Sequence, residues 1–78
     1  DTGASVHCVR DDQHVRNKRS PSPADQFLSV GEGFKLPITC VGDVDLVLCC
    51  MKDGRPRNDV PVTLTNVFVV PDFFLDII

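Results

Sequence analysis

The chain has 78 residues, of which 42% are hydrophobic and 24% charged, and its formal net charge is −3. This length allows one domain with a small core, and the composition is that of a globular rather than a disordered chain. The acidic balance excludes a general attraction to nucleic-acid phosphates, and no apolar run approaches the roughly 20 residues of a membrane-spanning helix. We therefore expect a single domain over residues 1–78 that has no direct contact with nucleic acid and no membrane segment.

The first chemical feature is DTGAS at residues 1–5. An aspartate that enters a glycine-containing turn can present its carboxylate in a tight loop, and Gly3 lets backbone approach closely. The hydroxyls of Thr2 and Ser5 can brace such a loop. Two such loops facing each other would share one proton, so that one carboxylate activates water while the other protonates a peptide carbonyl oxygen. The chain contains a single triplet of this kind, so the pair requires Asp1 from each of two copies.

Residues 11–25 are polar and of mixed charge. Neither periodicity nor propensity supports a regular element, and we expect a long exposed loop. Its basic residues are offset by acidic neighbours and lack interleaved aromatics, which favours a solvated loop over a nucleic-acid contact. The segment contains three basic residues followed by two Ser-Pro dipeptides: Arg16, Lys18, Arg19 and Ser20-Pro21-Ser22-Pro23.

From residue 27 the pattern becomes that of β-strands. A short apolar run at 27–30 and a glycine-containing loop at 31–33 predict a hairpin. Alternation with a period of two follows over 34–40 and continues with the same parity over 44–50. One unbroken strand would be unusually long, so we expect a bend or turn near Gly42-Asp43. Pro37 predicts an edge position, because proline cannot donate to a β-ladder.

The second half of the chain continues the β pattern. Residues 52–56 contain Asp-Gly followed by proline and predict a turn. Alternation resumes at 60–64, and Asn66 breaks its phase. Residues 67–70 are continuously apolar, which indicates a strand covered on both faces, and Pro71-Asp72 ends it. Short strands, frequent turns and no helical periodicity predict an all-β sandwich or barrel.

The four cysteines are expected to be reduced thiols of an intracellular protein. Neighbours on a strand point to opposite faces, so Cys49 and Cys50 could not share a partner. The close Cys or His pairs of a zinc site are missing, and we expect neither a metal nor a cofactor. The four positions are Cys8, Cys40, Cys49 and Cys50.

Four segments in the same order carry a family resemblance. DTGASVH at residues 1–7 resembles the DSGASxH opening of the protease region in Pol polyproteins of Copia-type LTR retrotransposons. Residues 30–36 are similar to that family's V-x-D-G-x-x-L, and residues 42–46 to its G-x-V-x-L. LTNVFVVPD at 64–72 resembles its L-x-N-V-L-Y-V-P-D. A lone DTG is weak evidence, whereas the first and last segments in this order are strong.

The resemblance implies a retropepsin-like acid-protease fold, a closed β-barrel that forms half of the enzyme. It implies an aspartic endopeptidase that processes its own Gag–Pol precursor as a homodimer, so the partners are a second copy and that polypeptide substrate. Asp1 carries over as the catalytic residue, Thr2 and Gly3 as the loop that fixes it, and Ala4 and Ser5 as backbone and hydroxyl support. An intracellular, cytoplasmic location follows from the same resemblance.

The chain departs from the family at its ends. The strand expected before Asp1 is missing, and Asp76 stands where the family usually has asparagine. We therefore expect a fragment truncated at both ends, active in the intact parent but inactive alone. His7 matches a family position without an evident chemical role. Residues 31–33 and the region of Gly42 are both candidates for the flap that covers substrate.

Two alternatives remain open at the level of sequence. The first is a non-catalytic or degenerate Pol β-barrel domain, in which the DTGAS motif is a structural turn. The second is a nucleic-acid or metal module, against which the acidic balance and the missing zinc knuckle both count.

Overall fold

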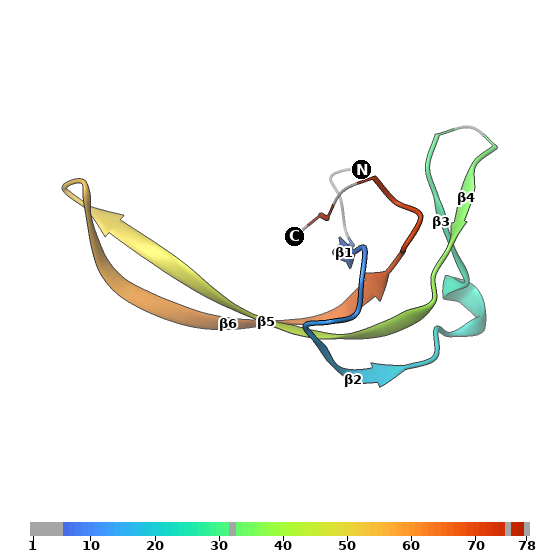
Figure 1. Ribbon diagram of the computed structural model, residues 1–78, viewed down its shortest axis with the longest axis horizontal. Helices are drawn as coiled ribbons and strands as arrows, with labels where there is room; N and C mark the ends of the chain where they lie inside the picture. The colour runs from blue at the N-terminus through green and yellow to red at the C-terminus, as the bar shows by residue number, and fades with distance from the viewer. Residues whose placement is uncertain (1–5, 32, 75, 78) are drawn as a thin grey trace.

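The computed structural model describes residues 6–31, 33–74 and 76–77 (Figure 1), and within strands it leaves out the side chains of residues 50 and 56–58. The all-β prediction is confirmed, since the described residues form strands and one 3-10 turn but no α-helix. The elements are β1 (Cys8–Val9), β2 (Val15–Arg19), η1 (Pro23–Asp25), β3 (Phe27–Ser29), β4 (Lys35–Pro37), β5 (Cys40–Lys52) and β6 (Arg55–Val69).

The strands form two sheets. One has four strands in the order β1-β6-β5-β2, and the other is the β3-β4 hairpin. β1 is parallel to β6, whereas every other pairing is antiparallel. Figure 1 shows β5 and β6 as a long curved ribbon, with β1 and the β3-β4 hairpin on its concave side.

The turn predicted at residues 52–56 is confirmed as a two-residue connection. Lys52 pairs with Arg55, and Asp53 and Gly54 between them have φ of 54° and 74°. Positive φ at both central residues matches the turn type whose twist suits a hairpin. The ribbon can therefore reverse tightly at its tip.

The irregularity expected near Gly42-Asp43 is present, but as a β-bulge rather than a turn. β5 runs unbroken for 13 residues, and the interruption of the alternating segment falls earlier, at Ile38 and Thr39. Asp43 of β5 lies opposite two residues of β6, Thr65 and Asn66. Asn66 has φ of 59°, which explains why the alternation changes phase there.

The expectation of an unstructured loop over residues 11–25 is wrong for part of the segment. Residues 15–19 form β2, whose Val15 pairs with Val44 of β5, and residues 23–25 form η1. Val15 is the one buried residue of β2, so the strand has no alternating apolar pattern that sequence reasoning could detect. Its formation depends on the neighbouring strand. The other four residues of β2 are exposed, as expected for this segment.

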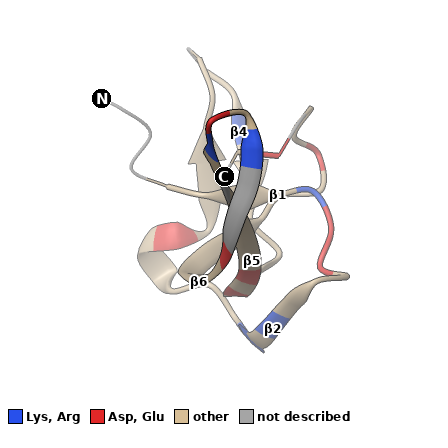
Figure 2. Ribbon diagram, turned by 90° about the vertical axis from the view of Figure 1, so that its left-hand side faces the viewer, with Lys and Arg blue, Asp and Glu red and all other residues tan. Residues whose placement is uncertain are grey.

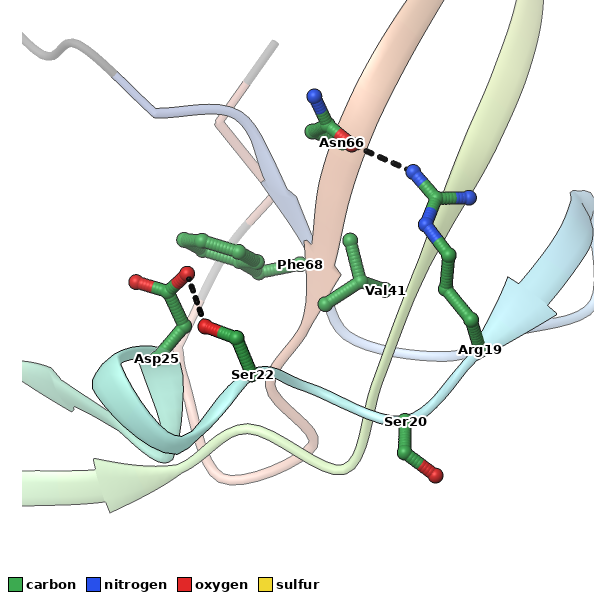
Figure 3. A pocket seen from close by; sticks show the side chains of 7 residues that line it. All are labelled: Arg19, Ser20, Ser22, Asp25, Val41, Asn66 and Phe68. Atoms are coloured by element: carbon green, nitrogen blue, oxygen red, sulfur yellow. Dashed lines mark hydrogen bonds between the residues drawn. The ribbon is translucent and has the colours of Figure 1, made fainter.

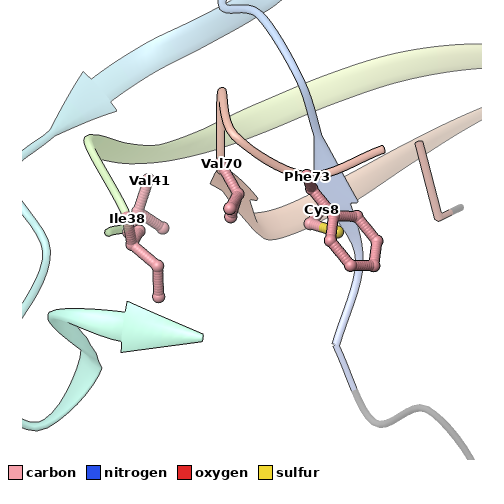
Figure 4. Packing of buried hydrophobic residues seen from close by; sticks show 5 residues of the cluster. All are labelled: Cys8, Ile38, Val41, Val70 and Phe73. Atoms are coloured by element: carbon pink, nitrogen blue, oxygen red, sulfur yellow. The ribbon is translucent and has the colours of Figure 1, made fainter. Parts of the chain in front are cut away.

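Hydrophobic side chains cover both faces of the sheet at the end that carries β1. Val67 and Val69 belong to one cluster, and Val70 belongs to the other, against which Phe68 packs. This confirms the prediction that residues 67–70 form a strand segment covered on both faces. Figure 4 shows the cluster on the concave side, formed by Cys8, Ile38, Val41, Val70 and Phe73.

Gly42 is required by close packing between β5 and β2. A Cβ built at this position would lie 2.8 Å from the backbone oxygen of Arg16 and closer still to Cγ1 of Val15. Both separations are shorter than those that real Cβ atoms show. The position therefore serves sheet packing.

In the part of the chain that the structure describes, no helix has the length and hydrophobicity that crossing a membrane requires.

Candidate functional site

The predicted catalytic segment lies outside the described residues. This applies to Asp1 and to its supporting residues Thr2, Gly3, Ala4 and Ser5. What the structure does describe is the chain that follows directly, beginning with the half-buried Val6 and His7. The nearest described strand is β1, which begins at Cys8.

β1 is held by hydrogen bonds on both of its edges. On one edge, Phe68 N–H donates to the His7 carbonyl at 3.0 Å, and Val70 N–H donates to that of Val9 at 2.8 Å. On the other edge, Cys8 and Ile77 exchange two backbone hydrogen bonds of 2.8 Å each. The strand that follows the DTGAS motif is an edge strand of the four-stranded sheet, and the bridge between Cys8 and Ile77 covers its outer side.

The Cys8 side chain points into the core and is 1% exposed. Burial raises the pKa of the Cys8 thiol, and the nearby Asp76 carboxylate contributes to the rise. A buried, protonated thiol is a poor nucleophile. We therefore interpret Cys8 as a packing residue of the hydrophobic core and not as a nucleophile. Cys40 and Cys49 also carry free thiols, the first half-buried and the second exposed.

Asp76 holds the residue that directly follows β1. Its Oδ1 accepts a hydrogen bond of 2.8 Å from the backbone N–H of Arg10. An asparagine oxygen could accept the same bond, so the departure from the family pattern at this position retains the backbone contact. The residue joins the chain after β1 to the segment that contains Ile77.

Two acidic residues of β5 lie beside basic residues of β2, as Figure 2 shows. Arg16 contacts Asp45 through Nε at 2.6 Å and Nη2 at 3.0 Å. The Thr63 hydroxyl donates to the same carboxylate at 2.7 Å. The hydrogen bonds from Arg16 and Thr63 lower the pKa of Asp45 to about 2. Both charged side chains are more than half exposed, so the pair links strands at the surface.

Asp43 is more enclosed, with 14% of its side chain exposed. Asn17 Nδ2 donates to its Oδ2 at 3.0 Å, while Arg19 Nη2 lies 3.5 Å from its Oδ1. Oδ1 has no hydrogen-bond partner among the described residues, so Arg19 acts on it as a charge. The Asn17 hydrogen bond lowers the pKa of Asp43, and the Asn66 backbone N–H and Arg19 lower it further. An ionised carboxylate in this position braces the bulge at Asn66 and the register shift between Arg16 and Arg19 of β2.

A pocket of about 450 Å³ lies between the sheet and the segment after β2. Figure 3 shows Val41 and Phe68 as its apolar side, with Arg19 and Asn66 at one end and Asp25 at the other. Its lining comes from β2, η1, β5, β6 and the connection that carries Ser20 and Ser22. Sequence reasoning missed this pocket because these residues are far apart in the chain and share no motif.

Among the described residues, no group of three or more His, Cys, Asp or Glu side chains is placed to hold a metal ion. No family model matches the chain, and neither the curated proteins nor the solved structures contain a match.

Proposed function

We propose that the chain is the protease domain of a Copia-type Pol polyprotein, an aspartic endopeptidase that acts as a homodimer. In this proposal Asp1 of each copy supplies one carboxylate of the catalytic pair. Thr2 and Gly3 shape the loop that holds it, with Ala4 and Ser5 in support. The proposal rests on the four sequence segments that resemble this family and on their order in the chain.

The observation that supports it best is the pairing of β1 with the end of β6. The first and last of the four segments, residues 1–7 and 64–72, lie at opposite ends of the sequence. In the structure they are neighbours, because the His7 carbonyl accepts the Phe68 N–H and Cys8 pairs with Phe68. The described parts of the two segments therefore belong to one structural unit.

The packing around the two flap candidates supports one of them over the other. Gly42 is buried against β2, so its region cannot open without disrupting the sheet. The β3-β4 hairpin, in contrast, pairs with no strand of the larger sheet, and Cβ atoms built at Gly31 and Gly33 would meet nothing within 4 Å. We therefore assign the flap to this hairpin, on the concave side where β1 also lies (Figure 1).

The proposed mechanism uses the two aspartates in different protonation states. Two carboxylates about 3 Å apart cannot both ionise comfortably, so one holds a proton. The ionised carboxylate takes a proton from water, and that water attacks the peptide carbonyl carbon. The protonated carboxylate gives its proton to the carbonyl oxygen. The two apparent pKa values belong to the pair rather than to either residue.

The test is Asp1→Asn in the intact Gag–Pol precursor, followed by immunoblotting of the processing products. We expect cleavage to fall by about 10³-fold or more, because asparagine cannot exchange the required protons. Asp53→Asn, at an exposed position in the turn between β5 and β6 and outside the four segments, is the matched control and should leave processing intact. Unchanged cleavage in Asp1→Asn would refute the assignment. A precursor that is inert, monomeric and insensitive to pepstatin-like inhibitors would indicate the non-catalytic alternative.

A further inference from the structure

The proposed protease function does not account for the two successive Ser-Pro dipeptides at residues 20–23. Residues 20–22 form the connection between β2 and η1, and Pro23 is the first residue of η1. β2 is the last strand of the four-stranded sheet, so this connection leaves from a sheet edge. Residues 20–22 belong to no strand or helix.

Backbone conformation and exposure make this connection accessible to an enzyme. Ser20 and Ser22 are both exposed, and Ser22 has φ of −67° and ψ of 161°, an extended conformation. A residue that precedes proline is disfavoured in the helical region, so both serines are biased toward extended backbone. Protein kinases bind their acceptor peptide in extended form. Proline differs from every other residue at the position after the serine, because its ring replaces the backbone N–H. A kinase whose pocket accepts that ring, and that needs no hydrogen bond from the N–H, can therefore select serines that precede proline.

We infer that Ser20 and Ser22 are phosphorylation sites for a proline-directed serine kinase that uses a nucleoside triphosphate. The serine Oγ forms a bond to the γ-phosphorus, and the bond from that phosphorus to the β–γ bridging oxygen breaks. The nucleoside diphosphate leaves with that oxygen, and the serine proton passes to a carboxylate base of the kinase.

The two hydroxyls differ in their surroundings. Figure 3 shows the Ser20 side chain directed away from the pocket and from Asp25. Ser22 Oγ instead donates to Asp25 Oδ2 at 2.9 Å, and the Ser22 carbonyl accepts hydrogen bonds from Asp25 N–H at 2.9 Å and Gln26 Nε2 at 2.8 Å. Ser20 is therefore the faster acceptor, whereas Ser22 must first give up its bond to Asp25.

Modification of Ser22 has a structural consequence. The phosphate replaces a donor with an acceptor group of roughly −1.5 to −2 charge, directly beside the Asp25 carboxylate. The repulsion loosens η1 and the end of the pocket that Ser22 and Asp25 form. Phosphate on Ser20 lacks this repulsion, because its side chain points away from Asp25.

The first test is phosphorylation of the folded whole protein by a purified proline-directed kinase and ATP, with sites mapped by tandem mass spectrometry. We expect phosphate on Ser20 early and on Ser22 later. Pro21→Ala should abolish the first and Pro23→Ala the second, while circular dichroism verifies that each variant is folded. Ser29→Ala, at an exposed serine of β3 that lacks a following proline, should change nothing.

Three results would overturn the inference. These are no phosphate on either serine, phosphate that persists when both prolines are replaced, or phosphate acquired by the urea-unfolded chain alone. The structural consequence has a separate readout, the thermal midpoint of the doubly phosphorylated protein. It should lie below that of the Ser20-phosphorylated form, and Asp25→Asn should narrow the difference; equal midpoints would contradict the proposed repulsion.

Discussion

The roles of the two arginines of β2 depend on the carboxylates of β5 beside them. Sequence reasoning interpreted Arg16 and Arg19 as part of a solvated loop. In the structure, Arg16 bonds to Asp45 and Arg19 lies beside Asp43, so both link β2 to β5. Exposed ion pairs contribute little individually, but Asp43 is more enclosed and also braces a bulge. The two ion pairs therefore differ in the burial of the carboxylate, not in charge.

The depressed pKa of Asp45 predicts how stability depends on pH. Because its pKa is about 2 in the folded state, against 3.8 for an unperturbed aspartate, the contribution of this carboxylate is complete above about pH 4. It is lost as the pH falls from about 4 toward 2, since folding then requires release of a proton that the unfolded chain retains.

The measurement is the urea midpoint of wild type and Asp45→Asn between about pH 2 and about pH 6. This range includes the pKa of Asp45 in the folded state and in the unfolded chain. Asp45→Asn should lower stability at pH 6 and converge with wild type toward pH 2. Asp72→Asn serves as the matched exposed carboxylate. Parallel curves for wild type and Asp45→Asn across the whole range would contradict this interpretation.

At the scale of elements, β6 is a strand of 15 residues whose neighbouring strands change along its length. Its first part pairs with β5 alone, and its last part pairs with both β5 and β1. The bulge at Asn66 separates these parts. A bulge increases the local twist and redirects the strand, so Asn66 lies where the exposed ribbon becomes the buried end of the sheet.

The left-handed conformation of Asn66 gives a prediction for this element. Asn66→Gly and Asn66→Val both remove the side-chain oxygen that accepts a hydrogen bond from Arg19 Nη2. Glycine adopts positive φ readily, whereas valine does not. We expect Asn66→Val to be less stable than Asn66→Gly by about 1–2 kcal/mol.

Chemical denaturation of the two Asn66 variants measures this difference, and an unchanged m-value would show that both unfold from the same compact state. Because the side-chain contact is lost in both, it cancels in the comparison. Equal stability of the glycine and valine variants would mean that the backbone conformation at residue 66 imposes no cost.

At the scale of the whole molecule, the hydrophobic core lies at one end, and the long β5-β6 ribbon extends away from it (Figure 1). The most buried large side chains, Val67, Val70 and Cys8, lie where β1 meets β6. Along the ribbon, Val47 and Leu48 are 63% and 51% exposed. The stability of the molecule therefore comes mainly from the end that carries β1.

This asymmetry predicts different costs for the same substitution. Val67→Ala removes two methyl groups from a fully buried position and should cost about 2 kcal/mol or more. Val47→Ala removes the same atoms from an exposed position and should cost less than about 1 kcal/mol. Urea unfolding of the two variants tests the prediction, and equal losses would place the core elsewhere.

Sequence alone was sufficient for the features that depend on local physics. The all-β class follows from a period of two, and the turn at Asp53-Gly54 follows from residues that tolerate positive φ. The buried segment 67–70 follows from its continuous apolar run. The hairpin about residues 31–33 was also predicted correctly, although Phe34 proved exposed rather than part of a buried face.

Tertiary structure decided whatever depends on residues that are distant in the chain. β2 has one buried side chain and exists because β5 offers it an edge. The pocket and the enclosure of Asp43 likewise arise where separate strands meet. The adjacency of residues 7 and 68 could not be read from the sequence either, because strand pairing is fixed by hydrogen bonds and packing between segments, and no local pattern encodes which segments meet.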